Sequence, residues 1–269
     1  MSHSPLPVKR ELSQPYTLAF ISAILMTLIS LAGIVFQSSL YQPDQLRQSF
    51  VANDILNLLI GLPFLLGSVW SARRGKWIGL LLLPGALLYI VYNYTAYTVA
   101  MFQTWLIIPG LCLVAVSMYA IYLTLSSMDT TSIQTTLQGK VPARFAAGVL
   151  IAFGVLFFSR SISQVIGLLT GKITLEGAEF GVLTADLLTT PIWVIGGLLL
   201  WRKSPLGYTS AIGLLFQASI LFIGLLIFFI LQPFLFTLPF RLEDFIVILV
   251  MGLFFSIPFG LFARALFKT

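Results

Sequence analysis

The chain has 269 residues, of which 58% are hydrophobic and only 9% are charged. Soluble domains carry roughly a quarter charged residues, so this chain cannot cover a water-facing surface. The composition excludes an ordinary soluble protein and predicts an integral membrane protein. The net charge of +6 does not indicate nucleic-acid binding, because the basic residues lie in short loops between apolar runs rather than on one face of a soluble module.

Eight apolar runs, each close to the roughly 20 residues that a spanning helix needs, occupy most of the chain. In chain order they cover residues 16–37, about 54–71, about 77–100, 105–125, 144–168, 182–201, 206–231 and 245–266. The expected fold class is therefore all-α, with eight transmembrane helices. Residues 1–15 form a polar tail. Residues 126–143 are rich in Ser, Thr and Gln and predict a linker between two halves, 16–125 and 144–269.

The lysines and arginines are distributed unequally between the two sides of such a bundle. The side of the N-terminus holds eleven of them, namely Lys9, Arg10, Arg73, Arg74, Lys76, Lys140, Arg144, Arg202, Lys203, Arg264 and Lys268. The opposite side holds Arg47, Lys172 and Arg241, and Arg160 lies within the fifth run. Because cytoplasmic loops are enriched in basic residues, both termini are predicted to be cytoplasmic. We expect a multi-pass protein of the cell membrane, in contact with membrane lipids.

Two segments of the sequence share an order of features. In the first half Asp54 is followed by Trp70, Arg73, Arg74 and Gly79, and in the second half Asp186 is followed by Trp201, Arg202, Lys203 and Gly207. The spacing from aspartate to tryptophan is 16 residues in the first segment and 15 in the second. The recurrence predicts two parallel four-helix repeats, which cross the membrane in the same sense because each has an even number of spans.

Several kinds of site are excluded by residues that are rare or absent. Cys112 is the only cysteine, and His3, in the polar tail, is the only histidine. An intrachain disulfide, a multi-cysteine metal site, a haem held by paired histidines and a Ser-His triad are therefore excluded. The sequence also lacks a phosphate-binding P-loop. We expect no metal and no cofactor, and any transport would be passive or ion-coupled.

Asp54 and Asp186 are predicted to lie at the outer ends of their helices. One interpretation is that each is an N-cap, accepting hydrogen bonds from the free amides of the first helical turn. The other is that both carboxylates face a cavity and bind a polar or cationic group. Their recurrence in both halves is compatible with either, because a duplicated cap is inherited as readily as a duplicated site.

Arg160 lies about 6 Å from residue 156, the midpoint of the fifth run, at about 1.5 Å per residue. An unpaired arginine near the bilayer centre costs about 2.5–3.5 kcal/mol on insertion scales. We therefore expect Arg160 to face protein or water and to form an ion pair with Asp186 or Asp54. The alternative is that its side chain extends to the outer headgroups.

Polar side chains are also concentrated in the third and seventh runs. In the third run one helix face is expected to carry Tyr89, Tyr92, Asn93 and Tyr97. Tyr94 and Tyr97 also suit an aromatic belt at the outer membrane interface, which is the interpretation we favour for them. Asn93 and Gln217 need partners if they are buried in the membrane. Hydrogen bonds between helices or a ligand cavity would supply those partners.

Three functional hypotheses follow from these residues. The favoured one is an outward-facing polar pocket between the halves that binds or transports a small polar or amphiphilic molecule. Its expected ligand-binding residues are Asp54, Asn57, Tyr92, Asn93, Arg160, Asp186 and Gln217. The second is an intramembrane enzyme using the two aspartates as a carboxylate pair, although neither lies in a protease or transferase motif. The third is a structural or accessory subunit that packs against a membrane-embedded partner.

Overall fold

The computed structural model describes residues 6–42, 44–102 and 104–267. This part of the chain is all-helical, and eight of its helical segments are long and apolar enough to cross a membrane. They are α1 (Ser13–Val35), α3 to α4 (Asp44–Arg73), α5 (Trp77–Ala100), α6 (Ile107–Ser127), α8 (Ala143–Leu169), α9 (Gly177–Trp201), α10 (Pro205–Phe236) and α11 (Leu242–Phe267). The prediction of an all-α fold with eight helices long and apolar enough to span a membrane is confirmed.

Two helices begin at least five residues earlier than the apolar runs predict. The second span begins at Asp44 rather than near residue 54, and the sixth begins at Gly177 rather than at 182. The apolar runs place the start of both helices too late because the first turns of these helices are polar. In α9 the Glu176 side chain and the Glu179 side chain form a reciprocal capping box that starts the helix. Asp54 and Asp186 therefore lie well inside their helices, and the interpretation that they are N-caps is wrong.

The second span contains a π-helical turn. It consists of α3 (Asp44–Leu56), the π-helix η1 (Asn57–Gly61) and α4 (Leu62–Arg73). The N–H of Leu62 donates to the carbonyl of Asn57, and Pro63 follows with no N–H to continue the ordinary ladder. Such turns are frequent at functional sites. Here the wider turn carries Asn57 on the side of the helix that contacts α5.

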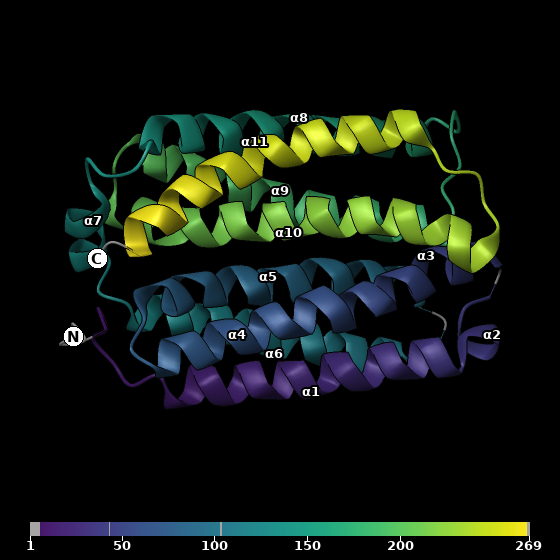
Figure 1. Cartoon of the computed structure of the whole chain (residues 1–269). Coiled ribbons are helices and arrows are strands. Elements are labelled where there is room, and N and C mark those ends of the chain that lie inside the picture. The colour runs from purple at the N-terminus through teal and green to yellow at the C-terminus, as the bar shows by residue number, and fades with distance from the viewer. Residues whose placement is uncertain (1–5, 43, 103, 268–269) are drawn as a thin grey trace.

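The helices form two groups that lie side by side (Figure 1). One group contains α1, α3, α4, α5 and α6, and the other contains α8, α9, α10 and α11. The groups meet where α5 packs against α9 and α10. A Cβ on Gly85 of α5 would collide with the backbone of Gly213 of α10. Two glycines at the crossing allow the helix backbones to approach closely, as small residues commonly do between membrane helices.

Helix α5 is the centre of the bundle. Of its most apolar window 83% is buried inside the protein, against 22% for the corresponding window of α11. The outer helices instead expose many large apolar side chains, such as Leu169, Leu188 and Phe234. Lipid is the natural solvent for these surfaces. The polar residues of α5 therefore lie where several helices can contact them.

The two ends of the bundle differ in charge, and we name them accordingly. The basic end, where α1 begins and α11 ends, is defined by Lys9, Arg73, Arg74, Arg202 and Lys203. The acidic end, where α2 (Gln37–Leu40) lies, is defined by Asp44, Glu176, Glu179, Glu243 and Asp244. Figure 1 shows α7 at the basic end and α2 at the opposite one.

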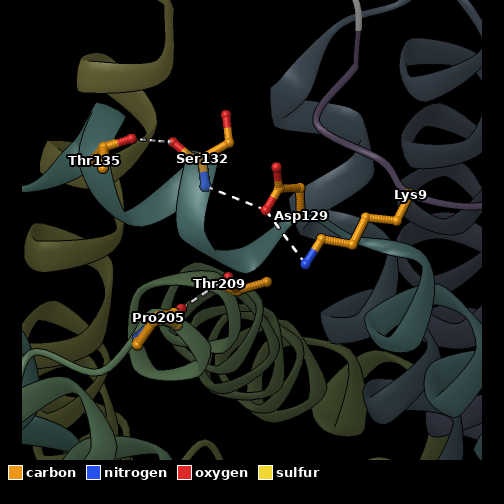
Figure 2. Close-up of polar contacts among 6 residues, drawn as sticks. All are labelled: Lys9, Asp129, Ser132, Thr135, Pro205 and Thr209. Carbon is orange, nitrogen blue, oxygen red and sulfur yellow. Dashed lines mark hydrogen bonds and ion pairs between the residues drawn. The ribbon is translucent and has the colours of Figure 1, made fainter.

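The linker predicted at 126–143 contains a short helix, α7 (Thr130–Leu137), that packs on α10. Asp129 caps this helix by accepting a hydrogen bond from the N–H of Ser132 at 3.4 Å. The same carboxylate lies 3.6 Å from the ammonium nitrogen of Lys9 (Figure 2). Ile133 and Leu137 are fully buried. The linker is thus an ordered cover attached to the N-terminal segment at the basic end.

Candidate functional site

A cavity of about 440 Å³ lies between the two groups of helices. Small-molecule sites typically measure roughly 300–1,000 Å³, so its size suits a small ligand. Its lining comes from α3, α5, α8, α9, α10 and α11. Along α9 it extends from Ala178 and Glu179, at the acidic end, to Trp193. At about 1.5 Å per residue this is about 20 Å of helix.

Part of the cavity lining is polar. It is formed by Arg160 and Gln164 of α8, Asp186 of α9, and Tyr92 and Asn93 of α5. Arg160 and Gln164 are four residues apart and therefore lie on one face of α8. The Tyr92 hydroxyl donates to Asp186 Oδ1 at 2.9 Å, which connects α5 to α9. These contacts bring together four of the seven predicted ligand-binding residues.

Arg160 lines this cavity, is exposed and has no ion-pair partner among the described residues. Within the described residues, no carboxylate oxygen lies within 4.0 Å of its nitrogens. The predicted ion pair with Asp186 or Asp54 is therefore not formed. Arg160 still acts electrostatically on Asp186, but Tyr92 already satisfies one oxygen of that carboxylate. The cavity thus presents a cation beside a carboxylate that is partly engaged.

Another part of the cavity lining is apolar and largely aromatic. It includes Phe157, Trp193, Phe222, Leu225 and Phe228. The ring of Phe157 lies 6.3 Å from that of Trp193 and 6.2 Å from that of Phe222, measured between centroids. Such aromatic pairs form a continuous apolar surface. A cavity lined by both polar and aromatic side chains is suited to a molecule with one polar end and one apolar end.

Asp54, Asn57 and Gln217 do not line the cavity. All three are fully buried between helices. Asp54 accepts hydrogen bonds from the hydroxyl of Tyr41 at 2.5 Å and from that of Tyr97 at 3.0 Å. The structure therefore does not bring these three predicted ligand-binding residues to the cavity. Each instead has hydrogen-bond partners within the bundle.

The two buried amides are bound by aromatic side chains. Asn57 Oδ1 accepts from the Tyr89 hydroxyl at 3.2 Å. Gln217 Oε1 accepts from the Trp193 indole N–H at 2.7 Å. The other end of the Gln217 amide, Nε2, is buried without a hydrogen-bond partner among the described residues. Because Trp193 also lines the cavity, this hydrogen bond from Trp193 to Gln217 helps to position a side chain of the cavity lining.

The aromatic-belt interpretation of Tyr94 and Tyr97 is wrong. Tyr94 is 0% exposed and Tyr97 is 2% exposed, and their rings stack at 5.3 Å. Tyr97 also does not share the cavity face with Tyr89 and Tyr92. Eight residues along a helix leave it about 80° from Tyr89 at 3.6 residues per turn, and this difference turns Tyr97 towards α3.

Some cavity residues were not among the predicted ligand-binding residues. They include Asn53, Glu179, Thr189 and Trp193. Thr189 and Trp193 follow Asp186 by three and seven residues, so helical periodicity from Asp186 would have found them. Asn53 was not chosen because the adjacent Asp54 was taken as the ligand-binding candidate. Its Nδ2 donates to Asn93 Oδ1 at 3.1 Å across the α3–α5 contact.

The two aspartates belong to different sites. Tyr97 binds Asp54 and Tyr92 binds Asp186, and five residues of helix place these tyrosines about 140° apart around α5. Only Asp186 lines the cavity. A carboxylate pair acting on one substrate needs both acids at that substrate. The arrangement therefore gives the enzymatic hypothesis no shared site.

Comparison of the chain with protein-family models, with curated proteins and with solved structures found no match. The functional inference therefore depends on the chemistry of the cavity alone.

Proposed function

We propose that this protein binds a small amphiphilic molecule in the cavity between its two groups of helices, as a binding or transport protein. The observation that supports the proposal is Arg160, a cation that lines the cavity together with aromatic side chains and has no ion-pair partner among the described residues. The polar end of the ligand carries negative charge and binds Arg160. Its apolar body lies against Trp193, Phe222 and Phe228.

The energetics of Arg160 favour this assignment. An arginine deep in a membrane protein costs about 2.5–3.5 kcal/mol on insertion scales unless it has a partner, and such residues usually mark functional sites. A carboxylate or phosphate can accept two parallel hydrogen bonds from the planar guanidinium. The amides of Gln164 and Asn93, which also line the cavity, would add hydrogen bonds that fix the orientation of the ligand.

We also propose that the basic end faces the cytoplasm of a cell membrane. The excess of lysine and arginine at that end supports this orientation. The cavity then opens towards the outside, because its lining reaches Glu179 at the acidic end.

We further propose that the two groups of helices are parallel repeats. Gly79, at the start of α5, packs against the end of α4, and Gly207, at the start of α10, packs against the end of α9. The residue that ends each preceding turn, Gly75 or Lys203, has a positive φ. Equivalent turns at equivalent places support a duplicated ancestor.

The binding proposal is tested with two probes of equal chain length, decanoate and decanol. Thermal unfolding of the protein in lipid nanodiscs is measured with each probe. A ligand that binds only the folded state raises its stability by about 2.7 kcal/mol at 100 times its dissociation constant. We expect decanoate to raise the melting temperature more than decanol does. Arg160→Gln should abolish the difference.

The matched control is Lys172→Gln, which removes an exposed cation at the same end of the bundle but outside the cavity. It should keep the full response to decanoate. Equal stabilisation by decanoate and decanol, or an unchanged response in Arg160→Gln, would contradict the proposal. The accessory-subunit hypothesis would be favoured instead if a membrane-embedded partner copurified in fixed ratio after mild detergent extraction.

A further inference from the structure

Asp54 is a carboxyl group buried in the membrane-spanning part of the bundle, separate from the cavity. It is 0% exposed and lies between α1, α3 and α5. Gly33 of α1 makes room for it, since a Cβ at that position would collide with both Asp54 Oδ2 and the Tyr41 hydroxyl. The carboxyl group is therefore pressed against α1 and shielded from lipid.

Every hydrogen-bond partner of this carboxyl group among the described residues is a neutral hydroxyl. Tyr41 and Tyr97 donate to its two oxygens, and the hydroxyl of Ser30 also contacts it. Burial, followed by the charge of Asp54, raises the pKa of Tyr41 far above its ordinary value, so Tyr41 keeps its proton and remains a donor.

No cation balances Asp54 in the described part of the chain. None of the described lysines or arginines lies within 4.0 Å of its carboxyl group. Helices α1, α2 and α10 carry no charged side chain. On α3 itself Arg47 pairs with Asp44 at 3.2 Å. On α9 the acids Glu179 and Asp186 face the cavity instead.

A buried carboxylate without a cation is strongly disfavoured in a low dielectric. The idealised penalty for an isolated ion reaches tens of kcal/mol, and in practice such a group takes up a proton instead. Hydroxyl donors reduce this penalty without adding the positive charge that would cancel it. Asp54 is thus expected to hold a proton at neutral pH.

Tyr97 allows the site to accommodate both protonation states. Its hydroxyl lies 3.0 Å from Asp54 Oδ1 and 3.1 Å from the carbonyl oxygen of Phe50, but it has one hydrogen to donate. When Asp54 is ionised, Tyr97 donates to the carboxylate. When Asp54 is protonated, the acid donates to Tyr97, and Tyr97 donates to Phe50. Turning one hydroxyl is sufficient to satisfy either state.

We propose that Asp54 is a reversible proton-binding site within the membrane. One proton is taken from water onto the carboxylate and returned to water, with no other bond made or broken. The site adjoins the cavity through Phe50, whose ring lies 4.2 Å from that of Tyr97 and which also lines the cavity. Two aromatic rings, those of Tyr97 and Phe50, therefore separate a proton bound at Asp54 from the cavity.

The test is infrared difference spectroscopy of the full-length protein in nanodiscs, which detects the C=O stretch of a protonated carboxylic acid. At neutral pH we expect a band that shifts in D₂O, is lost entirely in Asp54→Asn and bleaches reversibly at alkaline pH. Asp44→Asn is the matched control, with the same substitution on the same helix at an exposed, ion-paired acid. Asp44→Asn and Asp186→Asn should both keep the band assigned to Asp54.

Absence of this band at neutral pH would overturn the proposal, as expected if the site held an ionised carboxylate or a sodium ion. A band that never bleaches would equally overturn it, because the acid would then be neutral but not reversible. Should Asp54→Asn fail to elute as a monodisperse species, Tyr97→Phe keeps the test decisive. That variant removes a donor from the ionised state, so its band should persist to higher pH than in the wild type. An unchanged titration in Tyr97→Phe would contradict the mechanism.

Discussion

At the scale of single residues, two aspartates that look alike in the sequence have different partners. Asp186 lines the cavity and is bound by Tyr92. Asp54 is enclosed by hydroxyls and reached by no cation among the described residues. The difference arises because α5 presents Tyr92 and Tyr97 on different faces. We therefore expect substitutions of Asp186 to change ligand binding and substitutions of Asp54 to change proton binding.

The hydrogen bond between Trp193 and Gln217 can be tested at the same scale. Gln217→Leu leaves the buried indole N–H unpaired, and Trp193→Phe leaves Gln217 Oε1 unpaired. A buried donor or acceptor without a partner costs about 1–3 kcal/mol. The double variant removes both groups, so its loss should be smaller than the sum of the single losses.

The expected coupling energy is on the order of 0.6 kcal/mol, with about 1.7 kcal/mol as the upper limit seen between membrane helices. Unfolding of the four proteins in the double-mutant cycle measures it. Strictly additive losses would show that the bond contributes no stability.

At the scale of elements, polar ends and irregular turns position the site. Helix α3 begins ten residues before the apolar run and brings Phe50 and Asn53 to the cavity. The π turn at Asn57 then directs this amide to the tyrosines of α5. The short helix α7 is positioned by its cap and by the N-terminal segment, whose Lys9 N–H donates to the Ser127 carbonyl at 2.8 Å.

The attachment of α7 is tested by comparing Asp129→Ala with Lys9→Met. Asp129→Ala removes the N-cap and the ion pair together, and loss of such a cap typically costs about 0.5–2 kcal/mol. Lys9→Met removes only a surface ion pair, worth about 0–1 kcal/mol. Proteolysis of the 126–143 segment should therefore accelerate clearly in Asp129→Ala and little in Lys9→Met. Equal acceleration in both would show that the ion pair, not the cap, holds α7.

At the scale of the whole molecule, α7 lies at the basic end of the bundle, and the lining of the cavity reaches Glu179 at the acidic end. The proposed orientation places the cavity mouth outside the cell. This arrangement would give an extracellular amphiphile access to Arg160 from outside the cell.

The orientation is tested by cysteine labelling. Cys112→Ser removes the single native cysteine, which lies exposed on α6. Single cysteines are then introduced as Lys172→Cys at the acidic end and Thr135→Cys on α7. A membrane-impermeant maleimide applied to intact cells should label the first and not the second, and both should react after permeabilisation. The reverse pattern would show that the cavity opens to the cytoplasm.

The amino-acid sequence alone determined the number and approximate position of the spans. Burial of about 20 apolar residues in lipid is a local property of the chain, so composition suffices to find it. The residues Tyr92, Asn93, Arg160 and Asp186 were likewise recognised as functional candidates, because polar groups are costly within a membrane. The predicted starts of two helices were wrong, because these helices begin at Asp44 and Gly177 with polar turns that an apolar run does not include.

Only the tertiary structure decided which of these polar groups meet. One residue turns a helix by about 100°, so small differences in rotation decide whether a side chain faces a cavity or a neighbouring helix. That is why Asn53 lines the cavity while Asp54, its neighbour, does not. It is also why Arg160 is left without an ion pair while Tyr92 binds Asp186. Contacts between helices distant in sequence follow from packing, which no local pattern contains.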